Sequence, residues 1–281
     1  MVNSSEILDV VELIYFGPAL VASAFVCAKH GFSRDAGWLL LVILSLTRLI
    51  GASTGIAAEN NPTNSSLISC SLITSSIGST LLVAALTGVV NRVDSGTGQS
   101  PIPAPLRKLI QLPGLAAVAL GVFGGTKVGS SNASVRSVGY TYTKAAIILV
   151  LVQYLVAAAM LGFTTSKMHH IRAGDRTLFF CASIAAPFVL VRIIYSTCAA
   201  FNPTSRNLSI RSDTDTAIAI RAILGIAMEI ISVSIFIFGG IKAPKIVEAG
   251  KPGQKMPMHG TKQPQQQDFM DEARYGTASR Q

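Results

Sequence analysis

The sequence predicts an all-α membrane protein, a seven-transmembrane helix bundle with its N-terminus outside and a disordered cytosolic C-terminal tail. Only 13% of the 281 residues are charged and 50% are hydrophobic, whereas soluble domains carry roughly 25% charged residues. Seven stretches hold about the 20 mostly apolar residues that one helix needs to cross a bilayer. Lys and Arg are absent from 1–9 and 59–65, as expected for outer segments.

The first helix is expected at 10–28, after an outer N-terminal segment, 1–9. An acidic flank precedes it and basic residues follow it, which keeps the N-terminus outside and retains the segment in the mature protein. The seven-helix transmembrane domain spans 10–241. Its other helices are predicted at about 36–58, 66–90, 109–128, 142–164, 178–201 and 217–241.

The connecting segments carry the orientation. The expected inner loops, 29–35, 91–108 and 165–177, all contain Lys or Arg, and such residues favour the cytoplasmic side. The later outer loops also contain some, so the bias is firmer in the first half of the chain. Sequons for N-glycosylation all fall on segments assigned outside, which predicts a glycoprotein with most use at Asn3: Asn3, Asn64, Asn132 and Asn207.

Two helices should be buried within the bundle. The helix at 66–90 is dense in serine and threonine, and Ala117, Gly121 and Gly125 form a small-residue face on the helix at 109–128. Both patterns favour close helix packing. Cys70 and Cys198 lie near outer helix ends, so a disulfide between them is open, with buried free thiols favoured.

The tail, 242–281, lacks an apolar period and contains prolines, lysines and the stretch QPQQQ, which predicts disorder. Its juxtamembrane lysines could attract anionic lipid head groups at about 1 kcal/mol each, or the tail could simply be solvated. The expected partners are therefore the lipid bilayer and an unidentified small molecule. The net charge of +9 is dispersed rather than clustered, so nucleic-acid binding is not expected.

Five ionisable residues inside the expected helices are the candidate functional residues, because charges in hydrocarbon persist only when paired or facing a polar cavity. Counted from the outer helix ends, approximate depths at 1.5 Å per residue are about 15 Å for Arg48, 13 Å for Arg192, 18 Å for Glu229, 6 Å for Arg221 and under 5 Å for Glu12.

Two interpretations of these charges remain open. In one, Arg48, Arg192 and Glu229 form a structural ion pair that fixes helix packing, with Glu12 and Arg221 as an outer pair. In the other they line an outward-open pocket among the helices at 36–58, 66–90, 178–201 and 217–241. Glu229 would then be its acidic wall, and its polar lining would be Tyr195, Ser75, Ser76 and Ser79.

Several classes of activity do not fit. All four histidines lie in inner loops or the tail, which disfavours an intramembrane zinc hydrolase. The last helix has no mid-membrane lysine for a retinal Schiff base, and it lacks the NPxxY motif. No metal site, no cofactor and no nucleophile–base set is expected, so the protein is not expected to be an enzyme.

Two segments carry a resemblance to a known family: GFSRDAGWLLLVILSLTRLIG at 31–51 and APFVLVRIIYS at 186–196. They resemble a family of fungal seven-helix integral membrane proteins whose domain is described as of unknown function. A weaker similarity is to the fungal lipid-translocating exporter-like family. The resemblance covers about 8–241 and implies a fungal source and a seven-helix bundle, but no catalytic residue. Its matching positions are Gly37, Trp38, Arg48, Pro187, Arg192 and Tyr195.

The function predicted from these observations is that of a receptor-like sensor, which binds a small molecule from outside and signals through the inner loops and tail. One alternative is a transporter or lipid translocator that uses the charged midplane site. Another is a structural membrane protein with a buried ion pair. The expected location is the plasma membrane or an endomembrane of the secretory pathway.

Overall fold

Every described element of the chain is a helix. The computed structural model describes residues 4–31, 37–61, 64–96, 109–130, 132–166, 173–203, 205 and 214–244. Its elements are α1 (Ser4–His30), α2 (Trp38–Asn60), α3 (Ser65–Gly96), α5 (Leu112–Val128), α6 (Ala133–Ser166), α7 (Ala173–Phe201), α8 (Asp215–Ile220), the π-helix η3 (Arg221–Ala227) and α9 (Met228–Lys242). The predicted acceptors Asn3 and Asn207, and the tail beyond Pro244, lie outside the described residues.

The described helices are those of a multi-pass integral membrane protein. Six are long and apolar enough to cross a membrane, with α8, η3 and α9 forming one of them, and α5 is a shorter apolar helix. At 17 residues, α5 is about 25 Å long, close to the ~30 Å hydrocarbon core. Large apolar side chains stand out from the bundle, among them Ile14 at 70% and Val21 at 71% exposure, as a lipid-facing surface requires. Helices suit this setting because they satisfy their own backbone hydrogen bonds.

The helix boundaries differ from the sequence prediction at their polar ends. The helix expected from residue 142 begins at Ala133, so Arg136 lies on a helix and not in an outer loop. The helix expected to end at residue 90 continues to Gly96, and the one expected from residue 178 begins at Ala173. Hydropathy marks where the apolar run begins and ends, whereas the hydrogen-bonded helix continues into polar sequence.

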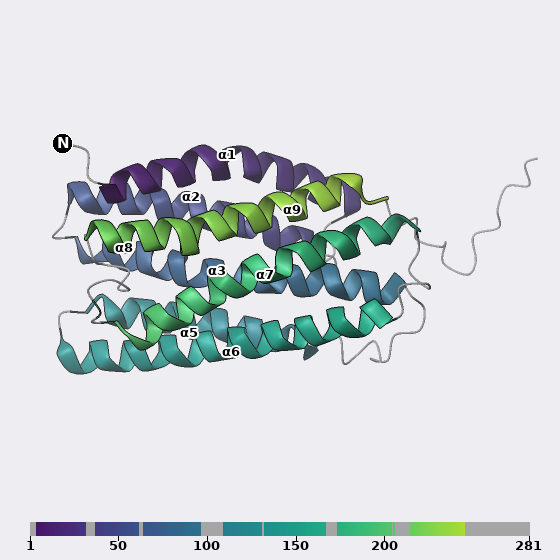
Figure 1. Cartoon of the computed structure of the whole chain (residues 1–281). Coiled ribbons are helices and arrows are strands. Elements are labelled where there is room, and N and C mark those ends of the chain that lie inside the picture. The colour runs from purple at the N-terminus through teal and green to yellow at the C-terminus, as the bar shows by residue number, and fades with distance from the viewer. Residues whose placement is uncertain are drawn as a thin grey trace, which may run out of the picture. The chain divides into compact units, whose positions relative to one another are not determined.

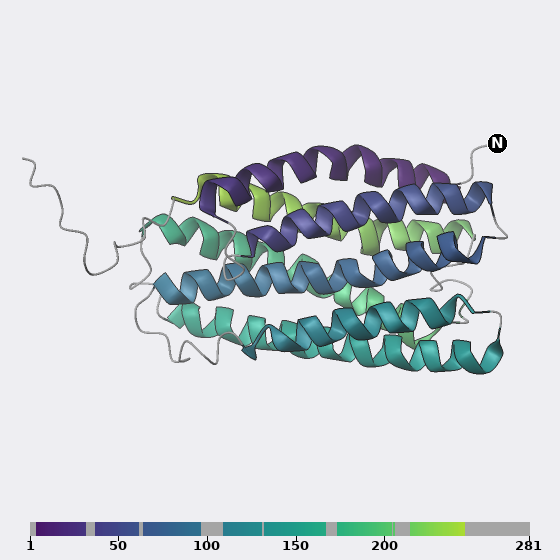
Figure 2. The same ribbon diagram turned by 180° about the vertical axis from the view of Figure 1, so that it is seen from behind.

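Helix α3 is central to the bundle, since it contacts α2, α5, α6 and α7 (Figures 1 and 2). Its second half, 78–94, is buried except at Ala84, as predicted, whereas most serines of its first half are only half-buried. Serine and threonine are tolerated there because their hydroxyls can bond within the helix, as Thr87 Oγ1 does to the carbonyl of Val83 at 2.8 Å. The predicted small-residue face of α5 is also buried, at Ala117, Gly121 and Gly125.

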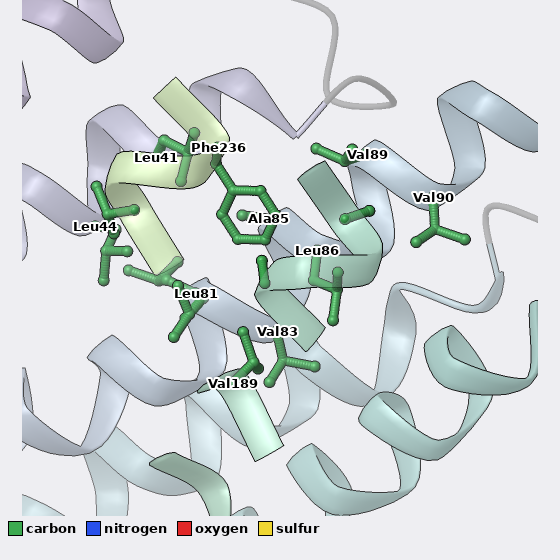
Figure 3. Close-up of a cluster of buried hydrophobic side chains, with 14 of the residues drawn as sticks. Leu41, Leu44, Leu81, Val83, Ala85, Leu86, Val89, Val90, Val189 and Phe236 are labelled. Atoms are coloured by element: carbon green, nitrogen blue, oxygen red, sulfur yellow. The ribbon is translucent and has the colours of Figure 1, made fainter. Parts of the chain in front are cut away.

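The helices run between two ends of the bundle (Figure 1). We call the end where α1 begins and α7 finishes the amino end, and the end where α1 finishes and α2 begins the far end. Figure 3 shows part of a packed apolar core, with residues from the far-end halves of α2, α3 and α9. Its members include Leu41, Leu86, Val89, Val189 and Phe236, each at most 1% exposed.

Charged side chains at the far end bind the backbone where α9 finishes. Lys29 Nζ donates to the carbonyls of Ile241 at 2.6 Å and Ala243 at 3.0 Å. Arg92 Nη2 donates to the carbonyl of Pro244 at 2.9 Å, and Arg92 also lies 3.6 Å from Asp175. Because the last carbonyls of a helix have no partner within it, these cations satisfy acceptors that would otherwise be open.

All four cysteines are free thiols. Cys70 and Cys198 are therefore not joined by a disulfide. Cys27 and Cys181 are buried, as favoured for free thiols, but Cys70 is half-buried and Cys198 is exposed. Since Cys198 faces outward from α7, the expectation of burial is wrong for that residue.

Candidate functional site

A cluster of buried charges joins α2, α7 and α9. Arg48 binds Glu229 through two parallel bonds, from Nε to Oε1 at 2.5 Å and from Nη2 to Oε2. Arg192 Nε donates to the same Oε2 at 3.2 Å. Glu229 is completely buried, and the two arginines are 6% and 5% exposed. A forked pair of this kind is the strong form of a guanidinium–carboxylate contact.

The cluster extends to α1 and α3. Glu12 Oε2 lies 3.8 Å from Arg48 Nη1, so two carboxylates face two guanidinium groups. Arg192 Nη1 donates to Ser196 Oγ at 2.7 Å, and Ser196 Oγ lies 3.1 Å from Ser79 Oγ. One connected network therefore fixes the relative positions of five helices.

A glycine of α3 makes room for this network. A Cβ atom added at Gly78 would lie 2.7 Å from Arg48 Nη2 and 2.9 Å from its Cζ. Because such separations are too short for carbon, any side chain at this position would displace the guanidinium. Gly78 therefore lets Arg48 pass across α3 to reach Glu229.

A cavity of about 140 Å³ lies beside the cluster. Its polar wall comes from α1, α2, α3, α7 and η3, and its mainly apolar wall from α5 and α6. The polar lining includes Glu12, Arg48, Ser76, Arg192, Tyr195 and Arg221. The apolar lining includes Leu72, Val128, Ala146, Ile147 and Val150. A second cavity of about 50 Å³ shares Glu12, Arg48, Ser75 and Arg221 and adds Asp9.

The residues predicted from the sequence meet in this region, but Glu12 takes the place on the cavity wall that was expected for Glu229. Arg48, Arg192, Tyr195, Ser75, Ser76 and Ser79 all line the larger cavity. Glu229, expected as the acidic wall, does not line it, because both arginines cover its carboxylate; Glu12 is the carboxylate of the wall instead. Glu12 and Arg221, expected as an outer pair, line both cavities, and the ion pair that Glu12 forms is with Arg48.

Two features of the site were missed from the sequence. Apart from Tyr140 and Thr143, the wall from α5 and α6 consists of small and aliphatic residues that are ordinary in a spanning sequence. The π-helix η3 carries Arg221, Gly225 and Ile226 into the cavity lining. π-Turns within helices occur frequently at functional sites, and they widen the turn so that the residues before and after them face different directions. The arginine and glycine at its start and middle are the only sequence signal we find for it.

The larger cavity offers groups that can bind a ligand. Guanidinium and hydroxyl groups donate hydrogen bonds, and the aliphatic wall can contact hydrocarbon. Within the described ranges, no three His, Cys, Asp or Glu side chains come together as a metal site. The described sequons Asn64 and Asn132 are exposed beside the amino-end turns of the chain.

The comparisons with known proteins give one match. A family model described as Domain of unknown function (DUF7702) matches residues 2–246. Neither a curated protein nor a solved structure matches the chain. The matched range takes in every described helix and all the residues of the cavity and the charged cluster. The chain therefore belongs to the DUF7702 family of domains of unknown function.

Proposed function

We propose that this membrane protein is a receptor-like sensor, which binds a small molecule in the larger cavity and has its amino end outside. The observation that carries the proposal is the cavity of about 140 Å³ beside the fixed charged cluster. Buried arginines are costly in a membrane unless they are paired or serve a polar site. Here Arg48 and Arg192 do both, since each binds Glu229 and each lines the cavity.

The orientation is part of the proposal. Lys29, Arg92 and Lys242 belong to the far end, and clustered basic residues favour the cytoplasmic side. The cavity lining continues along α7 from Arg192 through Ala199 and Ala200 to Pro203, which lies at the amino end. A ligand would then enter from outside, and signalling through the inner loops and tail would follow. A fungal source and a plasma-membrane or secretory location complete the proposal.

A ligand screen on cavity-filled variants tests this function. We expect some molecules of about ten non-hydrogen atoms to raise the melting temperature of the purified protein in nanodiscs. Ala146→Trp fills the cavity from α6 and should abolish those shifts, and Val150→Phe, one turn along, should weaken them. The matched control is Ile148→Trp, because Ile148 is on the same helix but exposed at 48%, so it should keep every shift.

Two outcomes would contradict the sensor. The cavity is not a binding site if no compound raises the melting temperature of wild type and Ile148→Trp more than that of both cavity-filled variants. The structural alternative, favoured by the complete burial of Glu229, would then hold. If a binding compound also accumulates inside sealed proteoliposomes, the protein is a transporter rather than a sensor.

A further inference from the structure

The side chains that line the larger cavity include more positively than negatively charged groups. Its wall holds three guanidinium groups, from Arg48, Arg192 and Arg221, and one carboxylate, from Glu12. Glu229 supplies a second carboxylate from beneath the two paired arginines. Asp9 lines the smaller cavity and not this one, but it interacts electrostatically with Arg221, which lines both. Counting Glu229 with the wall, three positive groups meet two negative ones.

Donors of this cluster remain for a ligand. Arg192 donates hydrogen bonds from Nε to Glu229 and from Nη1 to Ser196. Its Nη2 donates no hydrogen bond to the described part of the chain. Arg48 spends Nε and Nη2 on Glu229, and Nη1 has only the 3.8 Å contact with Glu12. An N–H group in a low-dielectric site gains most from a charged oxygen acceptor.

The other wall limits the rest of the ligand. Ala146, Ile147 and Val150 of α6, with Val128 of α5, offer aliphatic surface. An apolar cavity of about 150 Å³ admits benzene, so this cavity of about 140 Å³ admits a group of that size. A molecule that satisfies both walls has an acidic head group and a compact hydrocarbon body.

We propose that the ligand of the sensor is a small organic acid, bound as its anion with the acidic oxygens on Arg192 and Arg48 and the hydrocarbon against α6. This rests on the proposed function and narrows it to one class of compound. Tyr195 and Ser76 supply hydroxyls that can donate to a further acidic oxygen. Arg192 is held for this task by Glu229 on one side and Ser196 on the other.

Three probes of one shape test the charge requirement. Benzoate, benzamide and benzylamine share a ring and differ in the charge of the substituent. They are titrated by calorimetry into the full chain in neutral phosphatidylcholine nanodiscs. We expect benzoate to bind at least tenfold more tightly than benzamide, and benzylamine to show no saturable binding. Equal affinity for benzoate and benzamide, or tighter binding of benzylamine, overturns the proposal.

Variants then tie the binding to the arginines. Arg192→Gln should weaken benzoate binding at least tenfold while benzamide changes less than threefold. Arg221→Gln is the replacement test if Arg192→Gln does not fold. The hydrogen-bond donors to Glu229 are Arg48 and Arg192, so changing Arg221 leaves those bonds in place. Arg136→Gln removes the same charge from an exposed position on α6 and should leave benzoate binding unchanged. Unchanged benzoate binding in Arg192→Gln contradicts the proposed anchor, and unchanged binding in Arg221→Gln contradicts the proposed role of positive charge on the cavity wall.

The source of the anion is tested separately. The protein in nanodiscs that contain phosphatidic acid should bind benzoate with the same affinity as the protein in neutral nanodiscs. If phosphatidic acid stabilises the protein and benzoate does not, a lipid head group is the anion and the small-acid proposal fails. If neutral molecules bind in the cavity and are excluded by Ala146→Trp while benzoate does not bind, the sensor stands and only the acidic class is wrong.

Discussion

The two halves of the bundle use their charged residues in different ways. Toward the far end, Lys29 and Arg92 donate to backbone carbonyls at the finish of α9, and the neighbouring core is packed (Figure 3). Toward the amino end, Arg48 and Arg192 share the carboxylate of Glu229 from another helix, and a cavity lies beside them.

The difference follows from where a charge falls along its helix. At a helix end the last carbonyls are open acceptors, so a cation finds a partner without any second charge. In the middle of a helix every carbonyl is already used, and a cation must reach a carboxylate on another helix. Arg48 and Arg192 reach Glu229 in this way, and a cavity of about 140 Å³ lies beside them.

The strongest test of this comparison removes one carboxylate from each half. Glu229→Gln leaves two buried guanidinium groups without their shared anion, and breaking a buried pair costs about 3–5 kcal/mol. Asp175→Asn makes the same change at the far end, where Arg92 and Asp175 are also buried. Arg92 keeps its bond to the carbonyl of Pro244, so we expect a smaller cost of about 1–2 kcal/mol. Reversible unfolding in detergent micelles measures both values.

Equal losses in the two variants would show that the far-end cation also depends on its carboxylate. The comparison between helix-end and mid-helix charges would then be wrong. A folded, fully stable Glu229→Gln protein would show that Arg48 and Arg192 do not need Glu229, and the charged cluster could not be what orders α2, α7 and α9.

A second test compares how the halves accept added volume. Ala185→Leu adds a branched side chain where Ala185 is fully buried in the packed core, and overpacking typically costs about 1–3 kcal/mol. Ala146→Leu makes the same change on the cavity wall, where there is room, so we expect its cost to be under ~1 kcal/mol. Melting temperatures in one detergent rank the two variants, and the reverse order would mean that the cavity closes in solution.

Much of the fold could be predicted because spanning a bilayer imposes a strong pattern. Runs of about 20 apolar residues are visible directly, and the burial of α3 followed from its serines and threonines. The π-helix at Arg221–Ala227 could not be predicted in the same way. Arg221 and Gly225 do not by themselves distinguish a π-helix from an α-helix.

The candidate site was predictable in its residues but not in its geometry. The cost of a charge in hydrocarbon singled out Arg48, Arg192 and Glu229, and depth along the helices placed them at similar levels. Whether Glu12 or Glu229 lines the cavity depends on how the helices are rotated against one another, which the spacing of residues along one helix does not show. Gly78 was overlooked for the same reason, because the need for a missing Cβ appears only once Arg48 crosses α3.

The smallest loss of stability is expected for a change that affects only the end of α9. Lys29→Met removes both bonds from Lys29 Nζ to the carbonyls of Ile241 and Ala243. Since Lys29 is only half-buried, water can take over part of its role, and we expect a cost of about 1 kcal/mol. Amide hydrogen exchange should rise in the last turn of α9 and stay unchanged in α8 and η3.

Local opening of this kind is expected when the groups that are lost serve one helix end. The cavity-lining π-helix lies a full helix length from Lys242, with Glu229 anchored between them. If exchange in η3 also rises in Lys29→Met, the far-end contacts hold the cavity wall in place, and the two halves form one cooperative unit. Exchange confined to the last turn of α9 would mean that the charged cluster fixes the cavity without help from the far end.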